Sequence, residues 1–114
     1  MIDALVGHLV ADYLMQNDWM AQNKKKRSFP CAVHCFIWAT IIMLFAGWPL
    51  FVWPVLFITH YIQDRTNIIP WVMSKYQSGF KQEPFAPWSI IVVDNVWHIF
   101  TLWLIWKFLT LGIV

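Results

Sequence analysis

The chain contains little charge. Only 12% of its 114 residues are Asp, Glu, Lys or Arg, and 60% are apolar, whereas a soluble domain usually carries about twice that charged fraction. The 36 residues from Ser28 to Gln63 contain no formal charge at all. As one helix they would extend about 54 Å, more than a bilayer hydrocarbon core of about 30 Å, so this stretch must fold back on itself. The composition therefore excludes an ordinary soluble domain and predicts an integral membrane protein.

Several common signatures are also absent. The sequence has no glycine-rich phosphate loop, no G-x-S-x-G turn and no H-E-x-x-H zinc helix. Met1 begins directly in an amphipathic segment, without a basic region or a cleavage site, so we expect this first segment to be retained. The two cysteines, Cys31 and Cys35, stand four residues apart, which favours apolar packing on one helix face over a disulfide framework. Metal ligation together with His34 is the alternative for them.

The apolar runs predict an all-α fold and a single membrane domain over residues 1–114. A second run, from Phe85 to Val114, is interrupted only by Asp94 and Lys107. Pro30 suits the first turn of a helix, and Gly47 to Pro49 mark its end. We predict a four-helix transmembrane bundle with an intramembrane His/Asp centre, with helices at about residues 2–19, 30–48, 54–67 and 88–112. A three-span arrangement, in which the first segment only lies on the membrane surface, is the alternative.

Aromatic and basic residues predict how the chain sits in the membrane. Nine tryptophans support a membrane location, because indole rings favour the headgroup region, and the aromatic stretch 69–76 predicts a short interfacial helix. Seven of the eight Lys and Arg residues occur in or beside the first and third loops, at 24–27, Arg65, Lys75 and Lys81, and the second loop has no charge; Lys107 lies near the outer end of the fourth segment. The positive-inside rule places these loops in the cytoplasm and both termini outside. The lysine run is then a topology signal, so we expect membrane lipids as partners and no nucleic acid.

Histidine and aspartate recur at one spacing. Ionisable groups are costly inside a bilayer and turn inward toward partners, water or ions. Residues i and i+4 share one helix face, so a pair at that spacing projects its imidazole and carboxylate in the same direction. The pairs are His8 with Asp12, His60 with Asp64, and Asp94 with His98, and His34 stands alone in a further segment. These seven residues predict one shared, buried metal site.

The direction of the chain supports a single site. In the predicted topology the first and third segments run toward the cytoplasm, and the fourth runs away from it. The aspartate precedes the histidine only in the fourth segment. Every pair thus places its aspartate nearer the cytoplasm and its histidine deeper, about 6 Å apart along the helix axis. Random placement would not follow helix direction, which favours one centre in the cytoplasmic half.

The residue types suit a catalytic metal. Imidazole and carboxylate are zinc ligands, and a catalytic zinc keeps an open position, while manganese and iron accept the same donors. Four histidines and three paired aspartates also suffice for two metals. Some aspartates can instead accept a hydrogen bond from the second ring nitrogen of a metal-bound histidine. The structural alternative is a hydrogen-bonded network that only fixes helix packing, at about 0.6 kcal/mol per contact. Three carboxylates are a costly route to so small a gain, which favours a metal or proton-handling centre.

Five stretches resemble a family of small bacterial and phage membrane proteins that is catalogued as a domain of unknown function: Gly7 to Gln16, Asp18 to Ala21, His34, His60 to Arg65, and Asp94 to His98. The resemblance covers nearly the whole chain and departs at Asn95, where Gln is expected. It implies a bacterial inner-membrane location and the metal residues, but no substrate. The family is in turn similar in pattern to membrane-bound metal-dependent hydrolases, which also distribute His and Asp over several helices.

Three further polar residues are candidate substrate contacts, namely Gln16, Arg65 and Asn95. Gln16 follows Asp12 by four residues and can donate to a ligand or a substrate oxygen, or lie at the membrane surface. Arg65 can hold an anionic head group through its guanidinium, although a topology charge is the simpler explanation. Lys24 resembles a family position, but we expect it to be a solvated loop lysine.

These observations predict a metal-dependent hydrolase that acts on a lipid or other amphiphile, at a phosphate or ester bond near the cytoplasmic face. A metal site just below the head groups meets that bond while the tails stay in the bilayer. One of Asp12, Asp64 and Asp94 would accept a proton from water. The first alternative is ion or proton transport, which at 114 residues requires a homo-oligomer. The second is a non-enzymatic phage or bacterial membrane factor.

Overall fold

Seven helices make up the computed structural model, which describes residues 1–112 and contains no strand within that range. In chain order they are α1 (Ile2–Leu9), the π-helical turn η1 (Val10–Leu14), α2 (Asp18–Asn23), α3 (Ser28–Ala46), α4 (Val52–Arg65), α5 (Ile68–Tyr76) and α6 (Trp88–Thr110). The fold is therefore all-α, as the apolar runs predicted.

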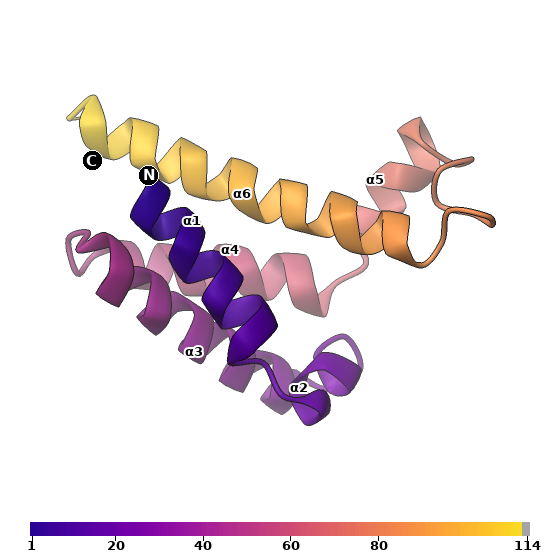
Figure 1. The fold of residues 1–114 in the computed structure, drawn as a ribbon, viewed down its shortest axis with the longest axis horizontal. Helices are drawn as coiled ribbons and strands as arrows, with labels where there is room; N and C mark the ends of the chain where they lie inside the picture. Colours follow the sequence, from indigo (N-terminus) through magenta and orange to yellow (C-terminus); the bar gives the residue numbers. More distant parts are fainter. Residues whose placement is uncertain (113–114) are drawn as a thin grey trace.

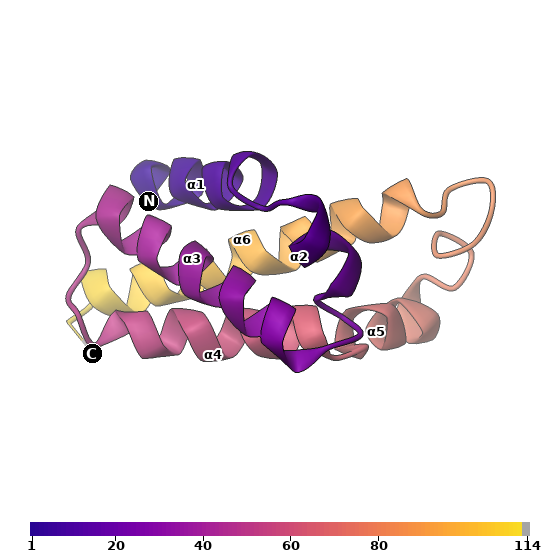
Figure 2. The ribbon, with the colours of Figure 1, turned by 90° about the horizontal axis from the view of Figure 1, so that it is seen from below.

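Four of these helices form the body of the molecule (Figure 1). α1 packs against α3 and α6, and α4 packs against the same two helices, so the four enclose one centre. α1 begins and α6 ends at the end of the long axis where α3 turns into α4 (Figures 1 and 2). α2, α5 and the connector 77–87 lie toward the opposite end. Successive long helices thus run in alternating directions.

Within residues 1–112, two helices, not the predicted four, are long and apolar enough to cross a membrane. They are α3, with 19 residues, and α6, with 23. α1 and η1 contain 8 and 5 residues and α4 contains 14. Each of these two segments extends only about 20 Å, whereas the hydrocarbon core is about 30 Å thick. Four membrane-spanning helices are therefore not confirmed, because the first segment is interrupted before α2 and α4 contains only 14 residues.

The predicted helix over residues 2–19 is interrupted. The Met15 N–H bonds to the carbonyl of Val10 at 3.0 Å, and this i to i+5 bond makes η1 a π-helical turn. Asn17 is extended, and its side chain accepts a hydrogen bond from the Met20 N–H, which starts α2 as a separate helix. Asp12 lies within the π-helical turn, so the helix loses its regular form at a predicted site residue.

The other predicted helices lie within two residues of the observed bounds. Pro30 and Pro54 are each the third residue of their helix rather than its first. The helices can begin earlier because the first four backbone N–H groups of a helix have no intrahelical partner, so proline is tolerated at any of them. Gly47 ends α3 with a φ of 65°, a left-handed conformation that glycine adopts without strain.

Small residues let α1 approach α3 closely. Ala4 and Ala11 are buried, and a Cβ added at Gly7 would lie 3.2 Å from the Cβ of Phe45 and 3.3 Å from the Cα of Ile42. In a bilayer the hydrophobic effect does not drive helices together, so association depends on close packing, which small residues allow. This contact brings the polar residues of α1 and η1 against the middle of α3.

We expect Gly7→Leu to lower the free energy of unfolding by about 1–3 kcal/mol, because the new side chain must displace Phe45 or move α1 away from α3. The measurement is denaturant unfolding in detergent micelles, followed by circular dichroism. Gly79→Leu is the matched control, since a Cβ there meets nothing within 4 Å. Equal unfolding free energies for the two variants would contradict the importance of the close α1–α3 contact.

Candidate metal centre

Four helices and one turn bring the seven predicted metal residues into one cluster. Their sources are α1 for His8, η1 for Asp12, α3 for His34, α4 for His60 and Asp64, and α6 for Asp94 and His98. The four imidazoles are buried, each at most 1% exposed. The side chains of Asp12 and Asp94 keep 9% and 19% exposure, whereas Asp64 is fully buried. The histidines therefore form the interior of the cluster, and two of the aspartates reach its surface.

His34 and His60 face each other at the centre, and we call them the histidine pair. Their Nε2 atoms are 3.0 Å apart. Asp64 Oδ2 lies 3.1 Å from each of these nitrogens. Asp12 Oδ1 lies 3.2 Å from His34 Nε2 and 3.8 Å from His60 Nε2. Two ring nitrogens and two carboxylate oxygens from different elements thus converge.

These distances match a metal coordination shell. Ligand atoms bound about 2.0–2.1 Å from a tetrahedral zinc are separated by about 3.3 Å. Apart from their ion-pair contacts to histidine and lysine, Asp12 Oδ1 and both Asp64 oxygens have no hydrogen-bond partner. Buried acceptors that lack well-formed hydrogen bonds are costly, and a divalent cation would satisfy them. The residues present therefore fit a divalent metal, and buried His/Asp groups of this kind can hold one.

His98 lies beside the histidine pair and has free nitrogens. Its Nε2 is 3.3 Å from Asp64 Oδ1, the carboxylate oxygen that does not face the pair. Its Nδ1 is 3.7 Å from Asp94 Oδ2, beyond hydrogen-bond distance. Neither ring nitrogen of His98 has a hydrogen-bond partner. A buried imidazole in this condition has a lone pair available to a metal.

His8 is held differently, because both of its ring nitrogens are hydrogen bonded. Trp38 Nε1 donates to His8 Nδ1 at 3.0 Å, so His8 Nε2 carries the proton and donates to Asn95 Oδ1 at 3.0 Å. Asn95 in turn donates to the Tyr13 hydroxyl at 2.7 Å. His8 is close enough to a neighbouring carboxylate and imidazole to share an ion with them, but no lone pair is free in this arrangement. Asn95, predicted as a substrate contact, here orients His8.

Trp38 is a site residue that sequence reasoning missed. Its indole is 1% exposed and stacks on His60, with ring centroids 3.9 Å apart and 11° between the planes. One indole therefore holds His60 by stacking and His8 by its N–H. The available signal was that Trp38 follows His34 by four residues and so shares its helix face. Tryptophan enrichment at membrane interfaces concealed that signal.

Asp12 occupies the π-helical turn. Such turns change the register of a helix and are frequent at functional sites. Asp12 Oδ2 still lies 3.6 Å from His8 Nδ1, while Oδ1 reaches His34 on α3. The carboxylate therefore joins two helices, whereas the i, i+4 spacing indicated only its own helix partner.

The basic loop contributes directly to the site. Lys24 Nζ lies 3.2 Å from Asp64 Oδ2, and its side chain is only 17% exposed, so the expectation of a solvated lysine is wrong. Burial disfavours its charge, but the carboxylates around it, Asp64 first, outweigh burial and raise the pKa of Lys24 above its ordinary value. Lys24 therefore stays protonated and offsets part of the buried negative charge.

Lys25 and Arg65 attach this loop to the end of α4. Lys25 Nζ donates to the backbone carbonyls of Gln63, Asp64 and Thr66 at 3.4, 3.0 and 3.4 Å. Arg65 Nη1 donates to the backbone carbonyl of Lys25 at 2.9 Å. Arg65, a candidate contact to an anionic head group, thus links α4 to the basic loop in this structure.

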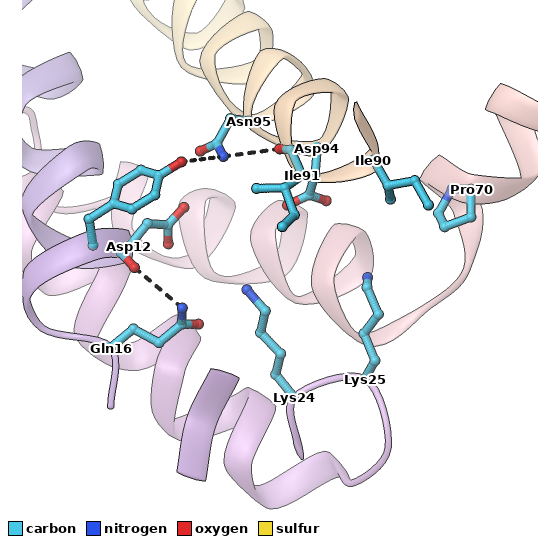
Figure 3. A pocket seen from close by; sticks show the side chains of 10 residues that line it. Asp12, Gln16, Lys24, Lys25, Pro70, Ile90, Ile91, Asp94 and Asn95 are labelled. Carbon is cyan, nitrogen blue, oxygen red and sulfur yellow. Dashed lines mark hydrogen bonds between the residues drawn. The ribbon is translucent and has the colours of Figure 1, made fainter. Parts of the chain in front are cut away.

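A cavity of about 340 Å³ opens beside the cluster (Figure 3). Asp12 and Asp94 form part of its polar wall, and Lys24 points into the space between them (Figure 3). Gln16 also lines it; its Nε2 donates to the Asp12 carbonyl at 3.3 Å, and its Oε1 is buried without a partner. The remaining walls are mainly apolar and include Tyr13, Pro70, Ile90 and Ile91. The cluster and the cavity share Asp12.

The two cysteines lie on α3, one on either side of His34 in the sequence. Cys31 and Cys35 are free and fully buried, with their Sγ atoms 3.9 Å apart. Neither belongs to a group that can hold a metal within residues 1–112. Apolar packing, the favoured prediction, accounts for both.

These features define an all-helical protein with two helices of membrane length and a buried His/Asp group able to hold a metal. Residues 1–113 match the model of a family described as "Protein of unknown function (DUF3307)", and the chain belongs to that family. No curated protein and no solved structure matches the chain. The predicted resemblance to a family of unknown function is confirmed, while the likeness to metal-dependent hydrolases stays a prediction.

We expect Lys24→Met to destabilise the metal-free protein by about 3 kcal/mol, because it leaves the buried Asp64 carboxylate without its cation. Added Zn²⁺ should raise the Tm of this variant more than that of the wild type, since the ion replaces the missing positive charge. Tm is measured in detergent with EDTA or with excess Zn²⁺.

Lys26→Met is the matched control, because Lys26 is exposed on the same loop. If the Lys24 and Lys26 variants had the same Tm under both conditions, Lys24 would have no role at the centre.

Proposed function

We propose that this protein is a membrane-embedded, metal-dependent hydrolase that cleaves a phosphate or ester bond of a lipid or other amphiphile near the cytoplasmic face. One observation carries the proposal: Asp12 belongs both to the group around the histidine pair and to the wall of the cavity. A metal held by that group would be reachable from the cavity. Catalytic metal sites keep such an open position, whereas structural sites are closed by protein ligands.

The roles of the residues follow from their positions. The histidine pair, Asp12 and Asp64 would hold the ion, which supplies Lewis acidity toward a phosphoryl or carbonyl oxygen. Nitrogen and oxygen donors suit zinc first, and manganese or iron as well. Asp94 lines the cavity and stays 3.7 Å from His98 Nδ1, so its carboxylate is available to accept a proton from the attacking water. Lys24 and Lys25 give the same wall positive charge for an anionic group.

The cavity supports an amphiphile because it offers two kinds of surface. Its polar wall contains the carboxylates and lysines, and Gln16 Oε1 can accept from a substrate hydroxyl. Its apolar wall includes Tyr13 and Ile91, which are 58% and 55% exposed and so connect the cavity to the outer surface. A head group can therefore occupy the cavity while its chains lie against α6.

The outer surface supports a membrane location. Large apolar side chains on α6 are each at least 43% exposed: Ile91, Val92, Val96, Phe100, Trp103 and Phe108. An apolar surface of this extent is unusual on a soluble monomer. In our proposal α3 and α6 cross the bacterial inner membrane, while the shorter α4 and α1–η1 segments run from the periplasmic side toward the cytoplasmic loops that follow them. The result is a single membrane domain of four segments, with both termini periplasmic and the basic loops cytoplasmic.

Cysteine labelling tests this topology. Ile2→Cys and Leu111→Cys, at positions 74% and 68% exposed, should react with an impermeant maleimide in intact spheroplasts. Lys26→Cys and Gly79→Cys should react only after permeabilisation, because the positive-inside rule keeps both loops in the cytoplasm. The native Cys31 and Cys35 are fully buried and provide an unlabelled background. Labelling of positions 2 and 111 from opposite sides would overturn the four-segment topology.

Hydrolysis is tested with purified protein in phosphatidylcholine vesicles that contain phosphatidic acid or an acylglycerol ester. We expect release of phosphate or fatty acid that requires added metal and stops on chelation. Asp12→Ala should lose both bound metal and activity, because Asp12 joins the cluster to the cavity. Asp94→Asn should lower kcat by about 10²–10⁴-fold while the ion at the histidine pair stays bound.

Glu83→Gln is the matched control, because Glu83 is an exposed carboxylate in the connector. Metal content is measured by plasma mass spectrometry. A protein without bound metal after metal-replete expression, or full activity in Asp12→Ala, would contradict the proposal. Proton or ion flux without any hydrolysis would favour a transport role.

A further inference from the structure

The carboxylates of Asp64 and Asp12 each face more than one histidine. Asp64 Oδ2 lies 3.1 Å from both nitrogens of the histidine pair, while its other oxygen, Oδ1, lies 3.3 Å from His98 Nε2. Asp12 Oδ1 faces the pair at 3.2 and 3.8 Å. The Asp12 carboxylate is also within 4.8 Å of a ring nitrogen of His98. Both carboxylates thus lie between the histidine pair on one side and His98 on the other.

We infer that the centre holds two divalent metal ions bridged by Asp64 and Asp12, one bound by the histidine pair and the other by His98. Carboxylates bridge two metals through their two oxygens, and paired catalytic metals lie about 3.5–4 Å apart. This inference rests on the proposed function, because it specifies the metal content of the same site.

A single ion at the histidine pair leaves part of the cluster unsatisfied. It would contact Asp64 Oδ2 but not Oδ1, which is buried and has no hydrogen-bond partner. His98 is 1% exposed, and neither of its nitrogens has a hydrogen-bond partner. Unpaired polar groups in such surroundings are costly. A second ion between Asp64 Oδ1 and His98 Nε2 satisfies both groups at once.

His8 is excluded from the second site by its hydrogen bonds. Trp38 occupies its Nδ1 lone pair, and its Nε2 proton is donated to Asn95. His8 and His98 have ring centroids only 5.7 Å apart, so proximity alone would not distinguish them. The hydrogen bonds therefore identify His98 as the metal ligand, whereas His8 holds Trp38 and Asn95 in position.

The test uses the full chain in detergent, loaded with Mn²⁺ as the probe. We expect two Mn²⁺ per chain by plasma mass spectrometry, and an electron paramagnetic resonance spectrum of an exchange-coupled pair. His98→Ala should reduce the content to one Mn²⁺ with the spectrum of an isolated ion, because the histidine pair remains. His8→Gln is the matched control: glutamine can keep both hydrogen bonds without an imidazole, so two coupled ions should remain.

The wild-type measurement decides the inference even if His98→Ala fails to fold. One Mn²⁺ per chain with an uncoupled spectrum would overturn it, as would two coupled ions in a folded His98→Ala. A different result would contradict the proposed function. Two coupled ions without lipid hydrolysis would support the dinuclear centre and contradict the hydrolase function. Metal-dependent hydrolysis with one ion would support the hydrolase function and contradict the dinuclear centre.

Discussion

The fully buried carboxylate of Asp64 is the group on which the rest of the structure depends. Removing an ionised carboxylate from water costs several kcal/mol unless partners surround it. The groups around Asp64 come from separate segments: the imidazoles of α3, α4 and α6, and Lys24 of the loop before α3. Those segments must therefore meet at one place, whatever their apolar faces would otherwise prefer. In a membrane, apolar packing alone would have no such specificity, since residues facing lipid and residues facing neighbouring helices would be chemically alike.

The remaining features hold the segments at the right separation. Gly7 lets α1 lie close to α3, and the π-helical turn directs Asp12 across to His34. Lys25 and Arg65 fasten the basic loop to the end of α4, which keeps Lys24 beside Asp64. Trp38 orients two imidazoles at once. Each of these contacts fixes the distances within the cluster, so a substitution at any of them should alter the geometry of the site.

The arrangement of donors and acceptors argues against a purely structural role. A network that only fixed helix packing would set each acceptor opposite a donor. At the histidine pair one ring nitrogen donates to the other, but Asp12 Oδ1 and both Asp64 oxygens have no hydrogen-bond partner, and neither does either nitrogen of His98. A cation would satisfy these acceptors, and the adjoining cavity would make that cation accessible. Membership of a family of unknown function supplies no chemistry, so the geometry of the cluster carries the functional argument.

Sequence alone predicted most of the helices and named the seven His and Asp residues that the structure brings together. Hydropathy, proline and glycine placed most helices within two residues, because these signals act locally. The i, i+4 spacing of His and Asp indicated the cluster, because residues four apart lie on the same face of a helix. Spacing could not reveal the break before α2, the entry of Lys24, or the hydrogen bonds that separate His8 from His98. Asn95 and His8 stand 87 residues apart in sequence. Such contacts depend on distances between segments, and only tertiary packing decides them.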